Sequence, residues 1–376
     1  MFDKFLDHIY EQSKYCLGFP VNVRNGLDSY DESELSCFLK YVLNNLGDPF
    51  SSSRYKLNTF NYEKCIVKFF AKLYNAPPAY WGYVTSCGSE GNLQALSVAK
   101  KKFKNKNPIL YFSDKSHYSI YNAAELVGIE TKVIPALIHH SMDLVRLNNS
   151  LDRSRPAIVF ANIGTTMAGA CDSLGTLKDC LSTIPHYIHV DAALFGLLTP
   201  FQDGYASAML DFKIKGFDSL SVSFHKMLGC PIPCGLFLSR EGLVSEDIEY
   251  VGTKNSTLLG SRSGLAVLLV WYLLKKLRVK GLKQQTNKCI QTSTYLSEKL
   301  HEINWPHWRN YFSNIIMLKS PEELTRNKWQ LATEDGWSHV ICMPHVNESI
   351  LDEFVADLIK QQIKGKQGQT GKLVAV

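Results

Sequence analysis

The sequence lacks the cysteine patterns of a zinc ribbon or of a small secreted protein. Its ten cysteines are spread over 376 residues, and no two of them are separated by only two residues. Neither a metal site built on cysteine pairs nor a dense disulfide framework is therefore expected. We predict no metal site, and reduced thiols in the cytoplasm fit this cysteine usage best.

The sequence also lacks a hydrophobic run long enough to span a membrane. The longest run, residues 265–274, has ten residues, whereas a spanning helix needs about 20. The first residues, MFDKFLDHIYEQSKYC, mix acidic and apolar side chains, which is not the pattern of a signal peptide. We therefore predict no membrane span.

Positive charge is not concentrated in one place. The net charge is +6, and the lysine run KKFKNK at residues 101–106 has no accompanying arginines or aromatic ladder. This run is predicted to be the solvated end of a helix rather than a nucleic-acid surface. The composition, 45% hydrophobic and 20% charged, is that of a globular protein with room for one large core or for two or three subdomains.

The most informative stretch is SVSFHKMLGCPIPCG, residues 221–235, which sets one lysine, Lys226, among small, apolar and turn residues. A lysine beside a buried cavity is desolvated, which lowers its pKa and frees its amine to form a Schiff base with a carbonyl. The alternative is a surface loop with an ordinary exposed lysine. The rest of the chain has to decide between them.

The order of the predicted elements indicates an α/β protein. Residues 1–75 read as a helical segment, with helices predicted over 2–15, 33–46 and 62–74. Residues 76–275 alternate short β-rich runs with helical segments, which predicts a mostly parallel central sheet covered on both faces. Residues 276–376 read as a small α+β C-terminal domain. The predicted strands of the large domain include 109–112, 131–134, 157–162, 187–190 and 219–222.

A tight polar turn precedes one long predicted helix, in WGYVTSCGSEGN. Ser86, Gly88 and Ser89 fall at the helix start, where unpaired backbone N–H groups and the helix dipole favour an anion. Because the turn has neither a P-loop lysine nor the GxGxxG spacing, it suits a single phosphate better than a nucleotide. The alternative is a well-capped helix with Ser89 as its cap.

Other polar residues follow the predicted strands, where ligands bind in such sheets. They are His117, Thr165, Asp191 and Lys226. Taken singly, His117 could be a loop histidine and Asp191 a helix cap. Together they supply a stacking ring, an acid and an amine beside a phosphate site, which are the parts that pyridoxal phosphate requires.

The roles follow from the chemistry of that cofactor. Asp191 would keep its pyridine nitrogen protonated, Lys226 would form the Schiff base, and His117 would stack on the ring. Gly88, Ser89, Ser223 and His225 would bind the phosphate.

Six motifs carry a resemblance to a known family: TSCGSEGN, SDKSHYS, FANIGTT, HVDAALFG, SVSFHKMLGCPIPCG and LGSRSG. The sequence resembles the group II pyridoxal-phosphate-dependent amino acid decarboxylases, and within them most closely the histidine decarboxylases of Gram-negative bacteria. The resemblance implies the fold type I architecture of aspartate aminotransferases and loss of carbon dioxide from an L-amino acid. It also implies a homodimer with its active sites at the subunit interface.

The resemblance assigns further residues. Thr165 matches a threonine that contacts the cofactor, Ala193 a small residue under the ring, and Phe19 and Pro20 a segment that lines the substrate pocket. Four positions depart from the pattern, since the relatives have glycine at Phe224, threonine at Ser89, asparagine at Ser263 and histidine at Leu265. Serine at position 89 keeps the hydroxyl that a phosphate needs, whereas the changes at Phe224 and Leu265 could reshape the substrate pocket. These changes leave the substrate open: L-histidine is the first candidate, followed by serine, aspartate and aromatic amino acids. The sequence is also compatible with a different pyridoxal-phosphate lyase or transferase, or with a non-catalytic relative of the fold.

Overall fold

The computed structural model describes residues 2–23, 35–242 and 245–373. It divides into two compact units: a large unit, Asn25–Thr166 and Ala170–Gln284, and a small unit, Met1–Arg24, Met167–Gly169 and Gln285–Val376. This division differs from the predicted boundaries at residues 75 and 275. The first 24 residues group with the C-terminal segment, and the rest of the N-terminal segment belongs to the large unit.

The large unit is built on a central sheet that confirms the predicted fold class. Among the described residues, seven strands have the order β2-β8-β7-β6-β5-β3-β4. The neighbours from β4 to β7 are parallel, and β8 pairs antiparallel with both β7 and β2. The strands are β2 (Trp81–Thr85), β3 (Ile109–Ser113), β4 (Thr131–Ile134), β5 (Ala157–Asn162), β6 (His186–Asp191), β7 (Ser219–Ser223) and β8 (Gly235–Ser239).

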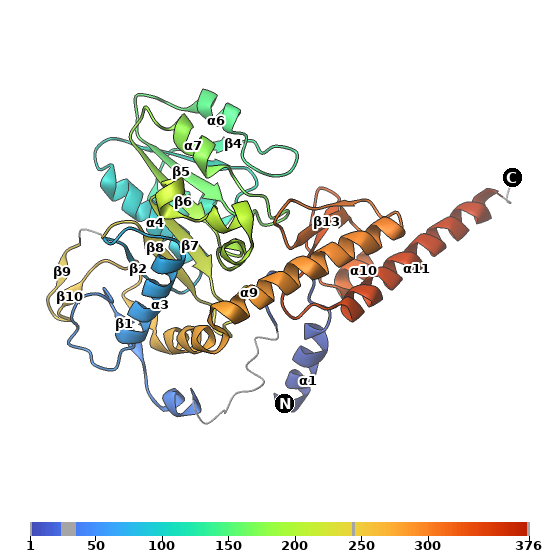
Figure 1. Ribbon diagram of the computed structural model, residues 1–376, viewed down its shortest axis with the longest axis horizontal. Coiled ribbons are helices and arrows are strands. Elements are labelled where there is room, and N and C mark those ends of the chain that lie inside the picture. Colours follow the sequence, from blue (N-terminus) through green and yellow to red (C-terminus); the bar gives the residue numbers. More distant parts are fainter. Residues whose placement is uncertain (1, 24–34, 243–244, 374–376) are drawn as a thin grey trace. The chain divides into compact units, whose positions relative to one another are not determined.

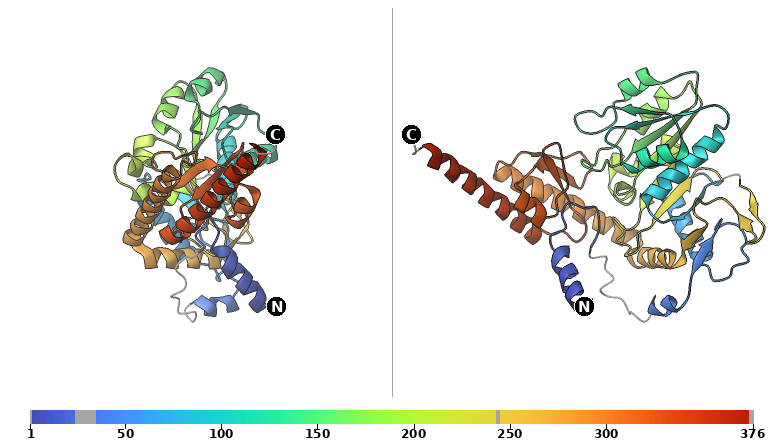
Figure 2. Two further views of the ribbon diagram at one scale, coloured as in Figure 1. Left: turned by 90° about the vertical axis from the view of Figure 1, so that its right-hand side faces the viewer. Right: turned by 180° about the vertical axis from the view of Figure 1, so that it is seen from behind.

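Several helices pack against this sheet (Figures 1 and 2). α4 (Gly88–Lys102) and α5 (Ser119–Val127) contribute Leu96, Ala99 and Ile120 to a buried cluster with sheet residues such as Phe112 and Phe160. β5 is buried at every position, as expected for a parallel strand covered on both faces. The continuous apolar runs of the sequence therefore became interior strands.

The prediction of a helix over residues 33–46 is wrong from residue 41 onward, and residues 33 and 34 lie outside the described part. Residues 35 and 36 are helical and lead into a 3-10 helix, η2 (Cys37–Lys40). Strand β1 (Asn44–Leu46) follows and pairs with β11 (Ser261–Ser263). Asn45 is buried, and its amide donates to Glu63 while its oxygen accepts the N–H of Thr59. These long-range contacts override the helical spacing of the local sequence.

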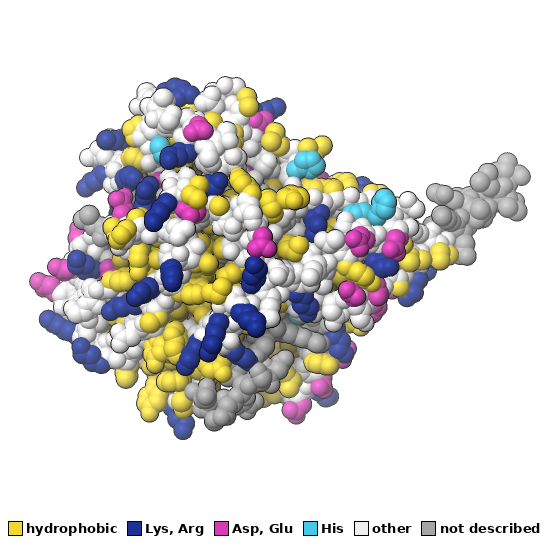
Figure 3. Space-filling model, in the orientation of Figure 1, with side chains coloured by type: hydrophobic (Ala, Val, Ile, Leu, Met, Phe, Trp, Pro, Cys, Tyr) yellow, Lys and Arg dark blue, Asp and Glu magenta, His cyan; other side chains and the backbone are white. Residues whose placement is uncertain are grey.

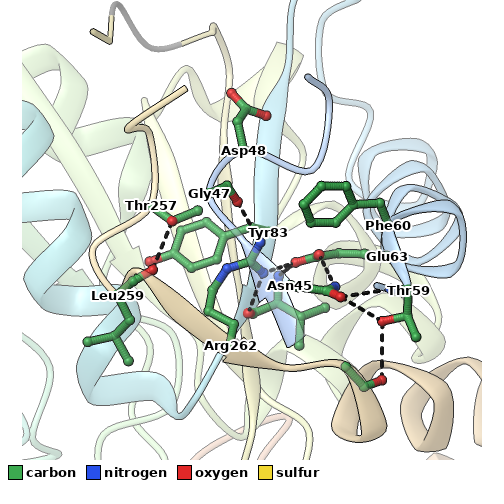
Figure 4. Close-up of polar contacts among 12 residues, drawn as sticks. Asn45, Gly47, Asp48, Thr59, Phe60, Glu63, Tyr83, Thr257, Leu259 and Arg262 are labelled. Atoms are coloured by element: carbon green, nitrogen blue, oxygen red, sulfur yellow. Dashed lines mark hydrogen bonds and ion pairs between the residues drawn. The ribbon is translucent and has the colours of Figure 1, made fainter. Parts of the chain in front are cut away.

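Glu63 lies on α3 (Phe60–Leu73) and forms a buried ion pair with Arg262 of β11 (Figure 4). The guanidinium of Arg262 lies 5.1 Å from the centre of the Tyr83 ring and donates to the carbonyl of Gly47 at 2.8 Å. These contacts join β1, β2, β11 and α3 within the large unit.

The remaining elements of the large unit are short, apart from one long helix. α9 (Gly264–Glu302) is kinked at Arg278, whose φ is +52°, and it continues into the small unit. The short elements are α6 (Leu144–Ser150), α7 (Leu174–Cys180), α8 (Phe212–Lys215), β9 (Asp247–Ile248) and β10 (Thr253–Lys254), with 3-10 turns η3 (Phe195–Leu197), η4 (Thr199–Phe201) and η5 (Gly204–Ala208).

The small unit has a mixed α and β composition. Its antiparallel sheet has the order β12-β13-β15-β14, formed by β12 (His307–Trp308), β13 (Ile315–Lys319), β15 (Trp337–Ile341) and β14 (Thr333–Glu334). Its helices are α1 (Phe2–Ser13), α10 (Glu323–Lys328) and α11 (Glu348–Leu373). In the described part of either unit, no helix combines the length and the apolar character needed to cross a bilayer.

Candidate active site

The carboxyl ends of β6 and β7 bring two of the predicted residues together. Asp191 is the last residue of β6, and it pairs in register with Ser221 of β7. At the end of β7, the N–H of its last residue, Ser223, donates to the carbonyl of Ala193, two residues beyond β6, at 2.9 Å. The two chain segments therefore stay side by side beyond the sheet, with Asp191 on one and the turn of Lys226 on the other.

The charges of Asp191, Lys226 and His117 act on one another. Burial lowers the pKa of the Lys226 ammonium, and the Asp191 carboxylate partly opposes this shift. Burial also lowers the pKa of His117, with Asp191 raising it and Lys226 lowering it further. His117 reaches this place from the loop between β3 and α5. The structure thus gathers an acid, an amine and an imidazole at one edge of the sheet.

The turn that carries Lys226 is fixed by its backbone. The N–H of Phe224 donates to the carbonyl of Cys234 at 2.8 Å, and the N–H of Cys230 donates back to the carbonyl of Phe224 at 3.0 Å. Gly229, with φ of +72°, closes the turn by donating to the carbonyl of Lys226. A positive φ favours glycine. Lys226 is therefore held at a defined, half-buried place and not on a loose surface loop.

His225 lies beside this lysine. Its Nδ1 donates to the carbonyl of Cys234 at 3.1 Å, and burial lowers its pKa. A neutral His225 therefore has only a lone pair left on Nε2, so the predicted contact with a phosphate requires the protonated imidazole.

The start of α4 has the features of an anion site. The cap position is Cys87, and no side chain of the described residues caps it. Ser89 is the second residue of the helix, so the alternative in which Ser89 is the cap is wrong. Glu90, which sequence analysis did not single out, instead fixes the preceding turn, because its Oε2 accepts the N–H of Ser86 at 2.6 Å. The N–H groups of the first turn remain available to a ligand.

Gly88 lies close to the Ser223 side chain, so that a side chain at position 88 would require the hydroxyl or the helix start to shift. A Cβ there would lie 2.7 Å from the hydroxyl oxygen of Ser223 and 3.7 Å from the Cβ of Ala193. The backbone of Gly88, the hydroxyl of Ser223 and the methyl of Ala193 therefore meet at one place. Uncapped helix N–H groups beside a hydroxyl fit the phosphate of pyridoxal phosphate.

Thr165 and Ala193 follow β5 and β6. The N–H and the Oγ1 of Thr165 both bond to the backbone of Ala170, at 2.9 and 3.0 Å, which closes a short loop with Thr165 buried. The N–H of Ala193 donates to Asp191 Oδ1 at 3.1 Å. The small residue predicted to lie under the ring thus also orients the carboxylate.

Phe224 does not fill the site. Its ring is fully buried and packs against Phe70 of α3, with ring centres 5.2 Å apart. Leu265 is half-buried in the first turn of α9. Phe19, half exposed, and Pro20 belong to the small unit.

The polar residues behind Asp191 are not among those that the sequence motifs predicted as site residues. Asn92 donates to Asp191 Oδ2 at 2.8 Å and also bonds to Ser119 and His189. All three partners are buried. Asn92 and His189 lie inside the motifs GSEGN and HVDAA. The polar residues of those motifs were therefore the sequence feature that could have predicted this hydrogen-bond network.

A cavity of about 540 Å³ lies at the other edge of the sheet. Its lining includes Lys102, Tyr187, Asp218 and Glu241. Tyr187 and Asp218 stand at the beginnings of β6 and β7, whereas ligands of such sheets bind at the strands' carboxyl ends. This cavity is therefore separate from the site around Asp191.

The fold is that of the pyridoxal-phosphate enzymes of fold type I, and the residues at its carboxyl edge fit that cofactor. A solved structure, L-methionine decarboxylase from Streptomyces sp. 590, has the same fold, with a TM-score of 0.85 at 21% identity over 96% of this chain and 94% of that one. The model of the pyridoxal-dependent decarboxylase conserved domain matches residues 59–305.

Curated relatives agree with that match. Histidine decarboxylase from Vibrio campbellii (strain ATCC BAA-1116) is 34% identical over 95% of both chains. Serine decarboxylase 2 from Oryza sativa subsp. japonica is 36% identical over 95% of this chain and 77% of its own length. The chain therefore belongs to the pyridoxal-dependent decarboxylase family and is a pyridoxal-phosphate-dependent amino acid decarboxylase.

Proposed function

We propose that this decarboxylase converts L-histidine to histamine and carbon dioxide. The observation that carries the proposal is the similarity to the Vibrio histidine decarboxylase, which extends over 95% of both chains. The rice serine decarboxylase has a comparable sequence identity, 36%, but the alignment with this chain covers only 77% of its length. L-Serine is therefore the second candidate substrate.

We assign the cofactor contacts to the residues gathered at the carboxyl edge of the sheet. Bound pyridoxal phosphate supplies an electron sink for the electron pair left at Cα when carbon dioxide departs. Lys226 would hold it covalently, because burial lowers its pKa and raises the fraction of uncharged amine at neutral pH. Asp191 would hold a proton on the pyridine nitrogen, and His117 would lie over the ring.

The same proposal assigns the phosphate to the start of α4. The N–H groups of Gly88 and Ser89 and the hydroxyl of Ser223 would donate to it, with His225 adding a contact when protonated. Ala193 would leave room under the ring, and the buried Thr165 would hold the cofactor from the β5 side. Each of these groups is part of, or directly follows, a helix start or a strand end, so the site is held by regular structure.

We also propose that the enzyme is a cytoplasmic homodimer. The exposed apolar side chains of the large unit include Leu39, Val42, Leu57 and Tyr62. Figure 3 shows apolar side chains gathered over α3 and the start of α9, which is a surface suited to a second copy of the chain. All ten cysteines are free thiols, as in a reducing compartment. Light scattering should give twice the chain mass of 42.5 kDa.

The substrate assignment is tested by giving purified protein and cofactor each L-amino acid separately and identifying the amine by mass spectrometry. Histamine is the expected product. Ethanolamine instead of histamine would identify L-serine, and not L-histidine, as the substrate. Any other amine would contradict both substrate assignments.

The assignment of Lys226 has a separate test. Borohydride reduction should attach the cofactor to the peptide that contains Lys226, and Lys226→Ala should abolish this label. Lys101→Ala, a change at an exposed lysine, is the control. A label on another lysine would overturn the role of Lys226.

A further inference from the structure

A buried chain of hydrogen bonds leads from Asp191 into the core of the large unit. Asn92 Nδ2 lies 2.8 Å from Asp191 Oδ2, and Asn92 Oδ1 lies 3.1 Å from His189 Nε2. His189 Nδ1 lies 2.8 Å from the hydroxyl of Ser219, which lies 2.8 Å from that of Tyr187. The four residues behind Asp191 are at most 3% exposed, so water does not compete for these bonds.

The carboxylate at one end sets the direction of every bond in this chain. Carboxylate oxygens only accept, so Asn92 Nδ2 donates and Asn92 Oδ1 must accept from His189 Nε2. Burial lowers the pKa of His189 to about 3, so the imidazole is neutral and its one proton is on Nε2. His189 Nδ1 then accepts from Ser219, which accepts from Tyr187. All four donors point toward Asp191.

A second branch joins the same amide to His117. Asn92 Nδ2 lies 3.2 Å from Ser119 Oγ, which lies 2.9 Å from His117 Nδ1. The backbone N–H of Ser119 also donates to His117 Nδ1 at 3.2 Å, so that nitrogen carries no proton. The hydroxyl of Ser119 therefore accepts from Asn92 and donates to His117. A neutral His117 then has its proton on Nε2.

The amide of Asn92 has one stable orientation. Its Oδ1 accepts from both His189 and Ser221, the latter at 2.9 Å, and its two amide hydrogens go to Asp191 and Ser119. Reversing the amide would place Oδ1 against the carboxylate of Asp191 and leave two acceptors without a hydrogen. Such a buried mismatch costs about 1–3 kcal/mol for each unsatisfied group.

We propose that Asn92 is a positioning residue that sets the orientation of the Asp191 carboxylate and links it through the Ser119 hydroxyl to His117, with His189 holding the amide. This proposal rests on the roles proposed above for Asp191 and His117. Asp191 Oδ1 accepts from Ala193 and Oδ2 accepts from Asn92, so the carboxylate cannot rotate without losing both donors. The carboxylate therefore presents its remaining lone pairs in one direction. A fixed direction suits a hydrogen bond from the protonated pyridine nitrogen of pyridoxal phosphate.

The test uses full-length protein with variants that separate the two branches. Asn92→Ala removes both branches, and Ser119→Ala removes only the one to His117. His189→Leu removes the support of the amide, whereas His189→Gln keeps one donor and one acceptor. Asn122→Ala, a change at an exposed asparagine of α5, is the matched control. Circular dichroism establishes that each variant is folded.

The first readout is ¹⁵N NMR of histidine-labelled protein without the cofactor. The signals of His117 and His189 are assigned by their loss in the His117→Gln and His189→Gln variants. We expect a proton on Nε2 and a bare Nδ1 at both residues in the wild-type protein. Ser119→Ala removes the hydroxyl but keeps the backbone N–H that donates to His117 Nδ1, so both His117 and His189 should keep their proton on Nε2. A proton on Nδ1 of either residue in the wild-type protein would overturn the assigned direction of the chain.

The second readout is the dissociation constant of the cofactor, measured from its visible absorption. Asn92→Ala should raise it about tenfold or more, as expected for the loss of a hydrogen bond to a charged group. His189→Leu should raise it as well, and His189→Gln should restore most of the affinity. Unchanged affinity in a folded Asn92→Ala protein would overturn the positioning role. Should that variant not fold, equal affinities of the two His189 variants would overturn it instead.

Neither readout requires a substrate, so a product other than histamine would leave this proposal standing. Conversely, an unchanged cofactor affinity in the Asp191→Ala variant would contradict the proposed role of Asp191, whichever tautomers His117 and His189 adopt. The failure of one proposal can thus be told from the failure of the other.

Discussion

Arg262 and Glu63 form an ion pair in the interior of the large unit, with side chains only 3% and 0% exposed (Figure 4). Glu63 also accepts the N–H of Val84 at 2.8 Å and the amide of Asn45 at 2.6 Å. Every oxygen of this buried carboxylate therefore has a donor, which is the condition under which such a pair is tolerated. The pair joins α3, β1, β2 and β11.

Breaking this pair should strongly destabilise the protein. Arg262→Met leaves the carboxylate of Glu63 buried without its cation, and we expect the free energy of unfolding to fall by about 3–5 kcal/mol. The measurement is urea unfolding followed by circular dichroism. Lys283→Met, which breaks an exposed pair with Asp203, should cost at most about 1 kcal/mol. Adding Glu63→Gln to Arg262→Met should recover part of the loss, and a purely additive cost would contradict this account.

Gly88→Ala should weaken cofactor binding. Its Cβ would lie 2.7 Å from the hydroxyl oxygen of Ser223, so the helix start or the hydroxyl has to move. If one phosphate hydrogen bond is lost, the dissociation constant of the cofactor should rise about tenfold. Gly175→Ala is the control, because a Cβ there meets no atom within 4 Å. Equal affinities of the two variants would remove Gly88 from the phosphate site.

His189 should make stability depend on pH. Burial lowers its pKa from 6.5 to about 3, so below about pH 6.5 the unfolded chain binds a proton that the folded protein does not. Stability is therefore lost as the pH falls from about 6.5 toward 3. From pH 7 to pH 5 this residue should cost about 2 kcal/mol.

The contribution of His189 is isolated by comparing variants. His189→Gln cannot titrate, so its free energy of unfolding should fall less between pH 7 and pH 5 than that of the wild-type protein. His301→Gln, a change at an exposed histidine, should follow the wild-type protein. An identical pH dependence of the wild-type and His189→Gln proteins would mean that His189 is not buried in its neutral form.

Phe224→Ala should affect stability rather than substrate choice. The ring packs on Phe70 in the core, so its removal leaves a cavity that should cost about 3–5 kcal/mol in urea unfolding. The KM for the amino acid should stay close to that of the wild-type enzyme. A changed substrate preference with little loss of stability would instead show that Phe224 faces the substrate.

The sequence by itself determined the class of the fold and the grouping of the site. Short continuous apolar runs such as residues 157–161 favour interior strands, and parallel strands end at the same edge of the sheet. The residues that follow those strands, Asp191 and Lys226 among them, therefore had to come near one another. Local sequence carries this information because each residue's place is set by the strand before it.

The tertiary structure decided what depends on distant partners. Residues 44–46 became a strand because Asn45 is bonded to Thr59 and Glu63 and because β11, more than 200 residues away, supplies the pairing. The ring of Phe224 lies in the core because it packs against Phe70 of α3. The direction of the hydrogen bonds through Asn92 of α4 follows from the carboxylate of Asp191 on β6. A local pattern cannot encode these outcomes, since the energy of a buried polar group or ring depends on which neighbours the whole fold brings to it.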